Sequence, residues 1–182
     1  MTAVIFNVRI YLMFRLIKNI VFIAFIFFVG YIFGIKEVRF VEIISSSMEP
    51  TLKVGDRVIV VKKDVLKRQD IVVIEAPQGK KEFLTKRIVG LPSEKIEVKD
   101  GYVFINGKKL EEPYIKEKPV YVMVEEKIPE DSYFLLGDNR NESEDSSVWG
   151  PVKSSFIKGR VVCRYWPLKE FSFLKNTLPL KR

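Results

Sequence analysis

Three consecutive serines stand in the segment with the clearest potential for chemistry, residues 45–52, which reads Ser-Ser-Ser-Met-Glu-Pro-Thr-Leu. Pro50 can neither continue a helix nor donate to the ladder of a central strand, so we expect an ordered loop. A serine hydroxyl on such a loop becomes a nucleophile when a neighbouring group takes its proton. The chain has no histidine. Ser-His-Asp and Cys-His arrangements are therefore excluded, which leaves a lysine, a carboxylate or no catalysis at all.

Lys86 is the lysine whose surroundings best suit a general base. Strand alternation in residues 83–90 places Lys86 on the same face as Leu84 and Ile88, where burial would lower the pKa of its amine, while Arg87 points the other way. A base must be uncharged. Moving a lysine pKa from about 10.4 to about 7 requires that the ammonium form be destabilised by ~4 kcal/mol. On spacing alone the alternative is favoured, in which Lys86 is a surface lysine whose aliphatic chain packs along apolar neighbours while its amine stays in solvent.

The length and composition of the chain limit what can position these groups. A chain of 182 residues accommodates one membrane segment and one compact domain. Cys163 is the only cysteine, which excludes an internal disulfide, and without histidine no ordinary zinc or transition-metal site can form. We therefore expect neither a metal nor another cofactor.

The positive charge is concentrated near an apolar segment. The net charge is +8, and residues 1–36 contain four basic side chains and no acid. The remaining 27 basic and 23 acidic residues leave +4 for the rest of the chain. This distribution suits a domain near anionic lipid headgroups better than a nucleic-acid-binding protein, so we expect a lipid bilayer and no nucleic acid as partner.

Residues 20–35 are uncharged and almost wholly apolar, and with Leu16, Ile17 and Asn19 they approach the ~20 residues needed to cross a bilayer. No site for signal-peptide cleavage follows, so we predict an uncleaved anchor over residues 19–36. The excess of basic residues before this anchor predicts a cytoplasmic N-terminus, residues 1–18, and an extracytoplasmic domain, residues 37–182. Residues 1–14 either extend the helix or lie along the interface.

Short β-branched runs separated by turn residues begin at Gly55 and predict a mainly β domain. The firmest local feature is a three-stranded meander over residues 95–110, because its turns, Asp100-Gly101 and Asn106-Gly107, accept the positive φ of tight hairpins. The other predicted strands cover residues 57–63, 70–76, 83–89, 120–124, 132–136 and 156–165.

Two further segments have unusual composition. Gly, Asn, Asp and Ser dominate residues 137–150, a loop too long for a plain hairpin connection and therefore a candidate functional segment. Residues 165–174 mix large aromatic and basic side chains. These aromatic rings either complete the core or rest at a bilayer interface.

Three segments in order, behind the apolar helix, carry a resemblance to a known family. They are residues 45–52, then Lys-Arg-Ile-Val-Gly-Leu-Pro at 86–92, then Gly-Asp-Asn-Arg-Asn-Glu-Ser-Glu-Asp-Ser at 137–146, and Arg-Tyr-Trp-Pro follows at 164–167. Together they resemble bacterial type I signal peptidases, membrane-bound serine proteases that remove signal peptides from exported proteins. The short segment between Pro92 and Gly137 is similar to that of the compact members.

The resemblance implies a role for each matching residue. Ser47 is the expected nucleophile and Lys86 its general base, and the Ser45 hydroxyl with the Ser47 N–H is expected to form the oxyanion hole. The residues expected to support this site are Ser143, which orients the lysine amine, and Asp145, Asp138 and Arg140. Ordinary turn capping is the alternative explanation for the polar residues of this loop.

The chain departs from the family pattern at two positions. Ser147 stands where the family commonly has arginine, so an ion pair from Asp145 to that arginine cannot form. Ser46 stands where many members have glycine. Neither change removes a group expected to touch the substrate.

By this resemblance the expected activity is cleavage of preprotein signal peptides after small residues, typically Ala-x-Ala, at the outer face of the plasma membrane. Ile43 and Ile44 are candidates for the substrate pockets. The alternatives are a conjugative-transfer or repressor-type Ser/Lys peptidase and a non-enzymatic, membrane-tethered β-domain. Ser155 and Lys158 also fit the Ser-x-x-Lys spacing of penicillin-binding proteins, but the other motifs of that family are missing. Oligomeric state is not predicted.

Overall fold

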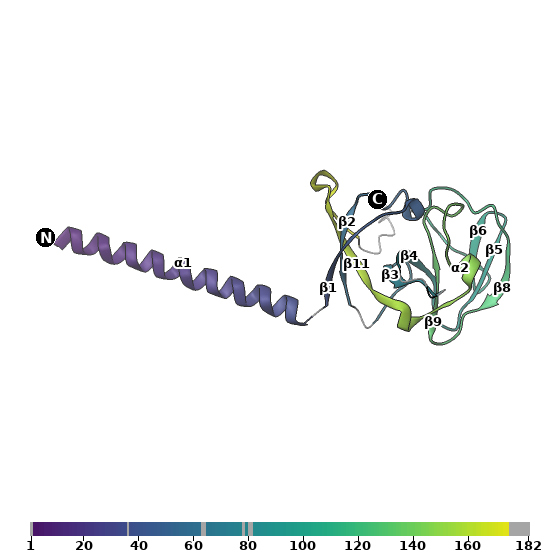
Figure 1. Cartoon of the computed structure of the whole chain (residues 1–182), viewed down its shortest axis with the longest axis horizontal. Helices are drawn as coiled ribbons and strands as arrows, with labels where there is room; N and C mark the ends of the chain where they lie inside the picture. The colour runs from purple at the N-terminus through teal and green to yellow at the C-terminus, as the bar shows by residue number, and fades with distance from the viewer. Residues whose placement is uncertain (1, 36, 63–64, 78, 80–81, 175–182) are drawn as a thin grey trace. The chain divides into compact units, whose positions relative to one another are not determined.

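The computed structural model describes residues 2–35, 37–62, 65–77, 79 and 82–174. The chain divides into two compact units, residues 1–37 and residues 38–182. Figure 1 shows the first as a helix and the second as a β-rich domain. Several predicted boundaries lie outside the described residues. Among them are Lys36 at the end of the anchor, Lys63 at the end of a strand, and residues 175–182 at the end of the extracytoplasmic domain.

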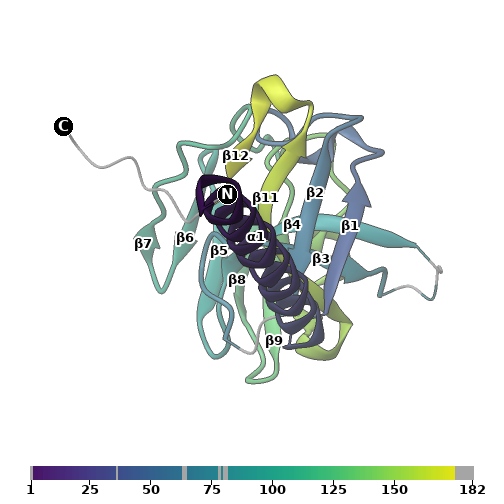
Figure 2. The same ribbon diagram turned by 90° about the vertical axis from the view of Figure 1, so that its left-hand side faces the viewer.

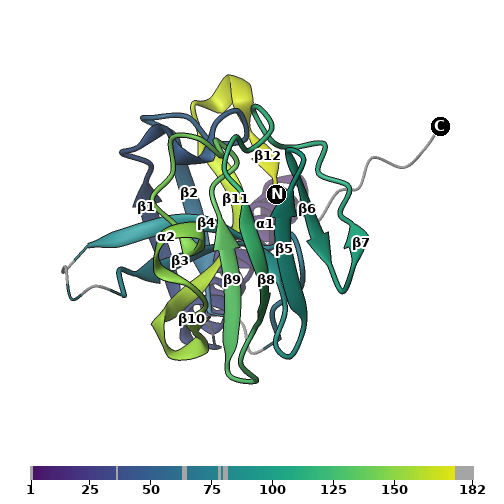
Figure 3. The same ribbon diagram turned by 90° about the vertical axis from the view of Figure 1, so that its right-hand side faces the viewer.

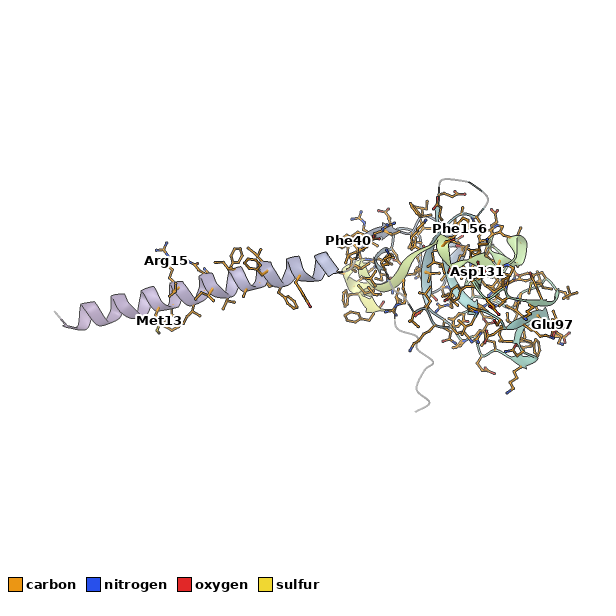
Figure 4. All side chains as sticks on the ribbon, turned by 90° about the horizontal axis from the view of Figure 1, so that it is seen from below. Met13, Arg15, Phe40, Glu97, Asp131 and Phe156 are labelled. Atoms are coloured by element: carbon orange, nitrogen blue, oxygen red, sulfur yellow. The ribbon has the colours of Figure 1, made fainter. Side chains whose placement is uncertain are left out.

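The first unit is one continuous helix, α1, Thr2–Ile35. Residues 2–14 therefore extend the helix rather than forming a separate segment. Its stretch Met13–Tyr31 is 19 residues long with a mean hydropathy of 2.0 and is a candidate membrane span. At 1.5 Å per residue it covers about 28 Å, close to the thickness of a bilayer core. Side chains project from both edges of this stretch in Figure 4, and its large apolar residues are exposed, as expected of a helix surrounded by lipid.

The larger sheet of the second unit is antiparallel, with Lys86 on one of its strands and the serine-rich segment in the connection between its first two strands. Its strands run in the order β1-β2-β11-β3-β4-β9-β10, and β12 pairs with β11 (Figure 2). The strands are β1 (Val38–Glu42), β2 (Arg57–Val61), β3 (Ile71–Glu75), β4 (Phe83–Gly90), β9 (Ser132–Leu136), β10 (Val152–Lys153), β11 (Ile157–Trp166) and β12 (Ser172–Phe173).

A smaller antiparallel sheet lies beside β9 (Figure 3). Its order is β7-β6-β5-β8, with β5 (Lys95–Lys99), β6 (Tyr102–Ile105), β7 (Lys108–Lys109) and β8 (Met123–Lys127). Asp100, Gly101, Asn106 and Gly107 all have positive φ, between 49° and 74°. The two predicted hairpin turns are thereby confirmed, since a type I′ turn requires positive φ at both central residues.

Buried side chains form three apolar clusters that hold these sheets together. The first contains Met48 and Leu52 of the serine-rich segment, packed with residues of β2, β3 and β11. The second joins the small sheet to Phe134 and Leu136 of β9. The third lies over β3, β4 and β9. The serine-rich loop is therefore anchored by its own apolar residues rather than lying free on the surface.

The mainly β prediction is confirmed, with one strand misplaced and three missed. The strand predicted at residues 120–124 is wrong in position, because β8 begins at Met123 and Val120 is 84% exposed. Valines there suggested a strand, but only from Met123 does the chain pair with β5. Strands β1, β10 and β12 were missed, since β10 and β12 have two residues each and β1 has no alternating pattern.

The aromatic residues near the C-terminus do not complete the core. Trp166, Leu168, Phe171 and Phe173 are 47–72% exposed. Phe40 of β1 is also exposed and contacts the ring of Tyr165 edge-on, with centroids 5.7 Å apart. The large sheet therefore carries an exposed apolar surface on β1, the end of β11, and β12.

Candidate active site

The serine-rich segment is a short, well-anchored 3₁₀ turn, Ser46–Met48. Met48 and Leu52 are 1% and 0% exposed, and the Leu52 N–H donates to the Met48 carbonyl at 2.9 Å. Ser47 is itself buried, at 8% exposure. Burial of these two apolar residues, which follow the serine, thus anchors the turn that carries its hydroxyl group.

The loop that follows β9 lies directly against this turn. The Asn139 N–H donates to the Ser47 carbonyl at 3.0 Å. At Gly137, a Cβ atom would lie 2.5 Å from the same carbonyl oxygen and would also collide with Ser143. Glycine is therefore required where the two loops approach each other.

Lys86 lies on β4, paired with Val72 of β3. The side chain is buried and its Nζ donates to Ser143 Oγ at 2.8 Å. Burial lowers the pKa of Lys86 from 10.5 to about 8, against the opposing attraction of Asp145, Glu144 and Asp138. The amine therefore loses its proton more readily than that of a solvated lysine, as a general base requires.

One cavity of about 180 Å³ is lined by both Ser47 and Lys86. Within it, Ser45 Oγ and Ser47 Oγ are 3.2 Å apart. Ala76, Pro77, Leu84 and Trp149 contribute apolar wall. The structure thus brings together the serine, the lysine and Ser143 from three distant segments, with the amine hydrogen-bonded to Ser143 and the Ser47 hydroxyl to Ser45.

Ile43 and Ile44, the candidates for the substrate pockets, differ in exposure. Ile43 belongs to the first apolar cluster and is 4% exposed, whereas Ile44 is 81% exposed. Neither is among the residues lining the cavity at Ser47.

Asp138 supports the site through Arg87, a residue that sequence reasoning had placed outside it. Arg87 donates from Nε and Nη2 to the two Asp138 oxygens at 2.8 and 2.6 Å. Thr51 Oγ1 donates to the same carboxylate, and the Arg87 guanidinium lies 4.0 Å from the Tyr114 ring centroid. This buried pair joins β4 to the serine-rich segment and to the loop after β9. The only sequence signal was that Arg87 follows Lys86.

Arg140 supports the same loop from the other side. Its guanidinium, 1% exposed, donates to both Glu112 oxygens, and its Nε donates to the Gly137 carbonyl at 3.0 Å. Glu112 was not predicted, because it lies in an irregular segment with no motif. Arg140 therefore stabilises the loop and does not line the cavity.

Comparison with known proteins shows the family. Residues 13–166 match the family described as signal peptidase, peptidase S26. The chain belongs to the signal peptidase family. A signal peptidase I of Leptolyngbya laminosa is 42% identical over 77% of this chain and 73% of its own length. A signal peptidase IB of Staphylococcus aureus (strain MRSA252) is 34% identical over 89% and 95%.

A solved signal peptidase I from Enterococcus faecalis V583 aligns with a TM-score of 0.49 and 30% identity, covering 53% of this chain and 97% of that chain. As a signal peptidase this chain is a hydrolase, so the non-enzymatic alternative is wrong. The family and the apolar N-terminal helix together indicate a membrane-anchored enzyme.

The serine found in place of the family arginine has a partner in this signal peptidase. Asp145 caps helix α2 (Ser146–Trp149) by accepting from the Ser147 N–H at 3.0 Å and from the Ser147 hydroxyl at 2.8 Å. Its other oxygen accepts from the Gly137 N–H at 2.9 Å. The shorter Ser147 side chain therefore replaces an ion pair by a local hydrogen bond, and Asp145 still holds Gly137.

The Ser-x-x-Lys spacing at residues 155–158 does not form a site. Ser155 is exposed on a 3₁₀ turn, and Lys158 lies on β11 with its amine 2.5 Å from a Glu75 oxygen. The Lys158 amine is thus engaged with a carboxylate of β3. The penicillin-binding alternative therefore has no support.

Proposed function

We propose that this signal peptidase cleaves signal peptides from preproteins by acyl transfer to Ser47, with Lys86 as general base. The observation that carries the proposal is the shared cavity, in which a buried amine of lowered pKa faces the loop of a buried serine. With a pKa near 8, about a tenth of the Lys86 side chains are neutral at pH 7.

In the proposed reaction, neutral Lys86 takes the Ser47 proton as Oγ attacks the scissile carbonyl carbon. The C–N bond then breaks, and the Lys86 ammonium returns a proton to the leaving amine. A water molecule, deprotonated by the same amine, hydrolyses the acyl-enzyme. Lys86 Nζ is held by Ser143, and we propose that the amine moves to Ser47 as substrate binds, which completes the proton path.

The proposed oxyanion hole consists of the Ser47 N–H and the Ser45 hydroxyl. Support comes from the 3.2 Å separation of the two serine oxygens, which puts the Ser45 hydroxyl beside the atom that attacks. Donors in this position act on the charge that develops on the carbonyl oxygen. Gly137, Asp138, Arg140 and Asp145 act indirectly by holding the loop against the turn.

We propose that the substrate lies beside this site with small residues, typically alanine, at the first and third positions before the cut. The cavity of about 180 Å³ is small compared with the ~300–1,000 Å³ of drug-sized ligand sites. That size suits short side chains.

For localisation, we propose a plasma-membrane anchor with the N-terminus in the cytoplasm, the apolar part of α1 in the bilayer and the β-rich unit on the outer face. The basic residues before the anchor support this orientation. The exposed apolar surface of Phe40, Trp166, Leu168, Phe171 and Phe173 suits contact with the bilayer interface. Anchoring enzyme and substrate in one bilayer raises their effective concentration.

The test is incubation of the full chain with a preprotein, followed by N-terminal sequencing of the product. We expect Ser47→Ala and Lys86→Ala to remain folded and to lose cleavage. Ser155→Ala and Lys158→Ala are matched controls, because both residues lie outside the cavity, and both should cleave normally. Normal cleavage by Ser47→Ala would refute the assignment. A cut after residues other than small ones would favour the related Ser/Lys peptidase.

A further inference from the structure

Asn139 has a buried side chain that reaches the turn carrying Ser47. The residue is 0% exposed, and its Nδ2 donates to the Ser46 carbonyl at 3.3 Å and to Glu142 Oε2 at 2.9 Å. Its backbone N–H donates to the Ser47 carbonyl at 3.0 Å. One residue thus binds two successive carbonyl groups on either side of the Ser47 Cα.

The orientation of the Asn139 amide follows from its neighbours. Both groups within reach of Nδ2, a carbonyl oxygen and a carboxylate oxygen, are acceptors only, so a flipped amide would place Oδ1 against two oxygens. Asn139 Oδ1 is buried without a hydrogen-bond partner in the described part of the chain. An unpaired buried acceptor is unfavourable. The donor bonds to Ser46 and Glu142 must therefore compensate for it.

The Ser46 carbonyl belongs to the same peptide group as the Ser47 N–H. A trans peptide is planar, so its C=O and N–H bonds point in opposite directions. A hydrogen bond that holds the Ser46 carbonyl therefore also sets the direction of the Ser47 N–H. The Glu49 N–H donates to this carbonyl as well, at 3.0 Å, so that the oxygen is held from two sides.

From these contacts we propose that Asn139 is a positioning residue for the oxyanion hole, and that Glu142 orients the Asn139 amide. The bond from Nδ2 holds the Ser46–Ser47 peptide plane, and the backbone bond holds the next one. Glu142, which also lines the cavity, acts through Asn139 by accepting from the hydrogen of Nδ2 that does not serve Ser46. The proposal rests on Ser47 being the nucleophile, as proposed above.

The first experiment compares Asn139→Ala with Asn141→Ala in the full chain, using a peptide that spans a cleavage site. Asn139→Ala keeps the backbone bond to Ser47 but loses Nδ2, so the Ser47 N–H is less well aimed. Asn141 is the matched control, because this exposed asparagine of the same loop bonds instead to the backbone of Lys118 and Val120.

We expect kcat of Asn139→Ala to fall about 10- to 100-fold, less than for complete removal of an oxyanion donor. KM should stay within about twofold, because the lost interaction serves mainly the transition state. The pH at which activity is half-maximal should not move, since Lys86 keeps its contacts. Asn141→Ala should keep its kcat within about twofold. A kcat for Asn139→Ala within threefold of the wild type, or a fall matched by a rise in KM, would overturn the proposal.

The second experiment uses Glu142, which is exposed and so can be changed with little effect on folding. Glu142→Ala should lower kcat about three- to tenfold, whereas Glu142→Gln, which still offers an acceptor, should recover most of that loss. The double variant Asn139→Ala/Glu142→Ala should be no slower than Asn139→Ala alone. Additive losses, or equal losses in the two Glu142 variants, would contradict an effect transmitted through the amide.

The two proposals fail in different ways. If Ser47→Ala is inactive while Asn139→Ala has normal kcat, the role of Asn139 is wrong and the nucleophile stands. If Ser47→Ala cleaves normally, the nucleophile itself is wrong. Should Asn139→Ala fail to fold, the comparison of Glu142→Ala with Glu142→Gln still tests whether the Asn139 amide positions the oxyanion hole.

Discussion

Replacing Lys86 by methionine tests directly whether the amine is buried at a free-energy cost. Methionine is also unbranched and of similar length, so it keeps the packing but cannot carry charge. In the folded protein the pKa of Lys86 is about 8, compared with 10.5 when the amine is solvated, as in the unfolded chain. The unfolded state therefore binds more protons than the folded state between pH 8 and pH 10.5.

The magnitude follows from these two pKa values. Below pH 8 the charged amine destabilises the fold by about 3 kcal/mol, since one pH unit corresponds to ~1.4 kcal/mol. As pH rises through this window that cost falls, to about 2 kcal/mol at pH 9 and to below ~1 kcal/mol at pH 10. The wild type thus gains stability with rising pH relative to Lys86→Met. Loss of the bond to Ser143 costs the variant about 1 kcal/mol at every pH and leaves this trend unchanged.

The assay is urea unfolding of the full chain in mild detergent, followed by tryptophan fluorescence. Both tryptophans, Trp149 and Trp166, lie in the β-rich unit, so the signal reports on the unfolding of that unit. We expect the difference in unfolding free energy between Lys86→Met and the wild type to shrink by about 2 to 3 kcal/mol from pH 7 to pH 10, because the wild type loses the cost of its buried charge. Lys158→Met is the control, because its amine pairs with Glu75 near the surface. Its difference should be small and nearly constant.

A stability difference for Lys86→Met that does not change between pH 7 and pH 10 would refute the reasoning. The amine would then be solvated in the folded enzyme, and its pKa would not be lowered. The proposal that Lys86 serves as a neutral base would lose its physical basis.

Four further predictions concern the same site. Activity should rise about tenfold per pH unit below pH 8 and level off above it, as Lys86 loses its proton, which a kcat/KM profile measures. Glu144→Gln should move that profile to lower pH, because Glu144 raises the pKa of Lys86; a move to higher pH would contradict this. Arg87→Met should cost about 3 to 5 kcal/mol of unfolding free energy by leaving Asp138 buried and unpaired, whereas a loss below 1 kcal/mol would show that water replaces the guanidinium. Gly137→Ala should lower kcat at least tenfold by pushing the loop away from Ser47, and unchanged kinetics would mean that the loop yields freely.

The chemical groups were predictable because they lie in contiguous motifs and because the absence of histidine removes the common bases. Residue type pointed to the serine-rich loop and strand alternation to Lys86, whereas the choice of Ser47 among the three serines came from the resemblance to a known family. The two hairpin turns and the apolar helix were equally local, since Asp-Gly, Asn-Gly and an uncharged run each determine a backbone conformation without distant contacts.

The supporting contacts were not predictable from local patterns. Arg87 was assigned to the opposite face of β4, which is correct, but only the fold shows that Asp138 lies there to receive it. Glu112 and Asn139 gain their roles from partners 28 and 93 residues away in sequence. In the same way, the exposure of Trp166 and Phe173 depends on what packs against β11 and β12, not on their own apolar character.

The sequence by itself determined which atoms can perform the chemistry in this protein, because nucleophilicity and basicity belong to residue types. Only the tertiary structure decided whether the Lys86 amine is dry enough to act as a base and how the Ser47 peptide group is oriented. Desolvation and hydrogen-bond direction depend on atoms brought together from strands far apart in the chain, and no local pattern contains that information.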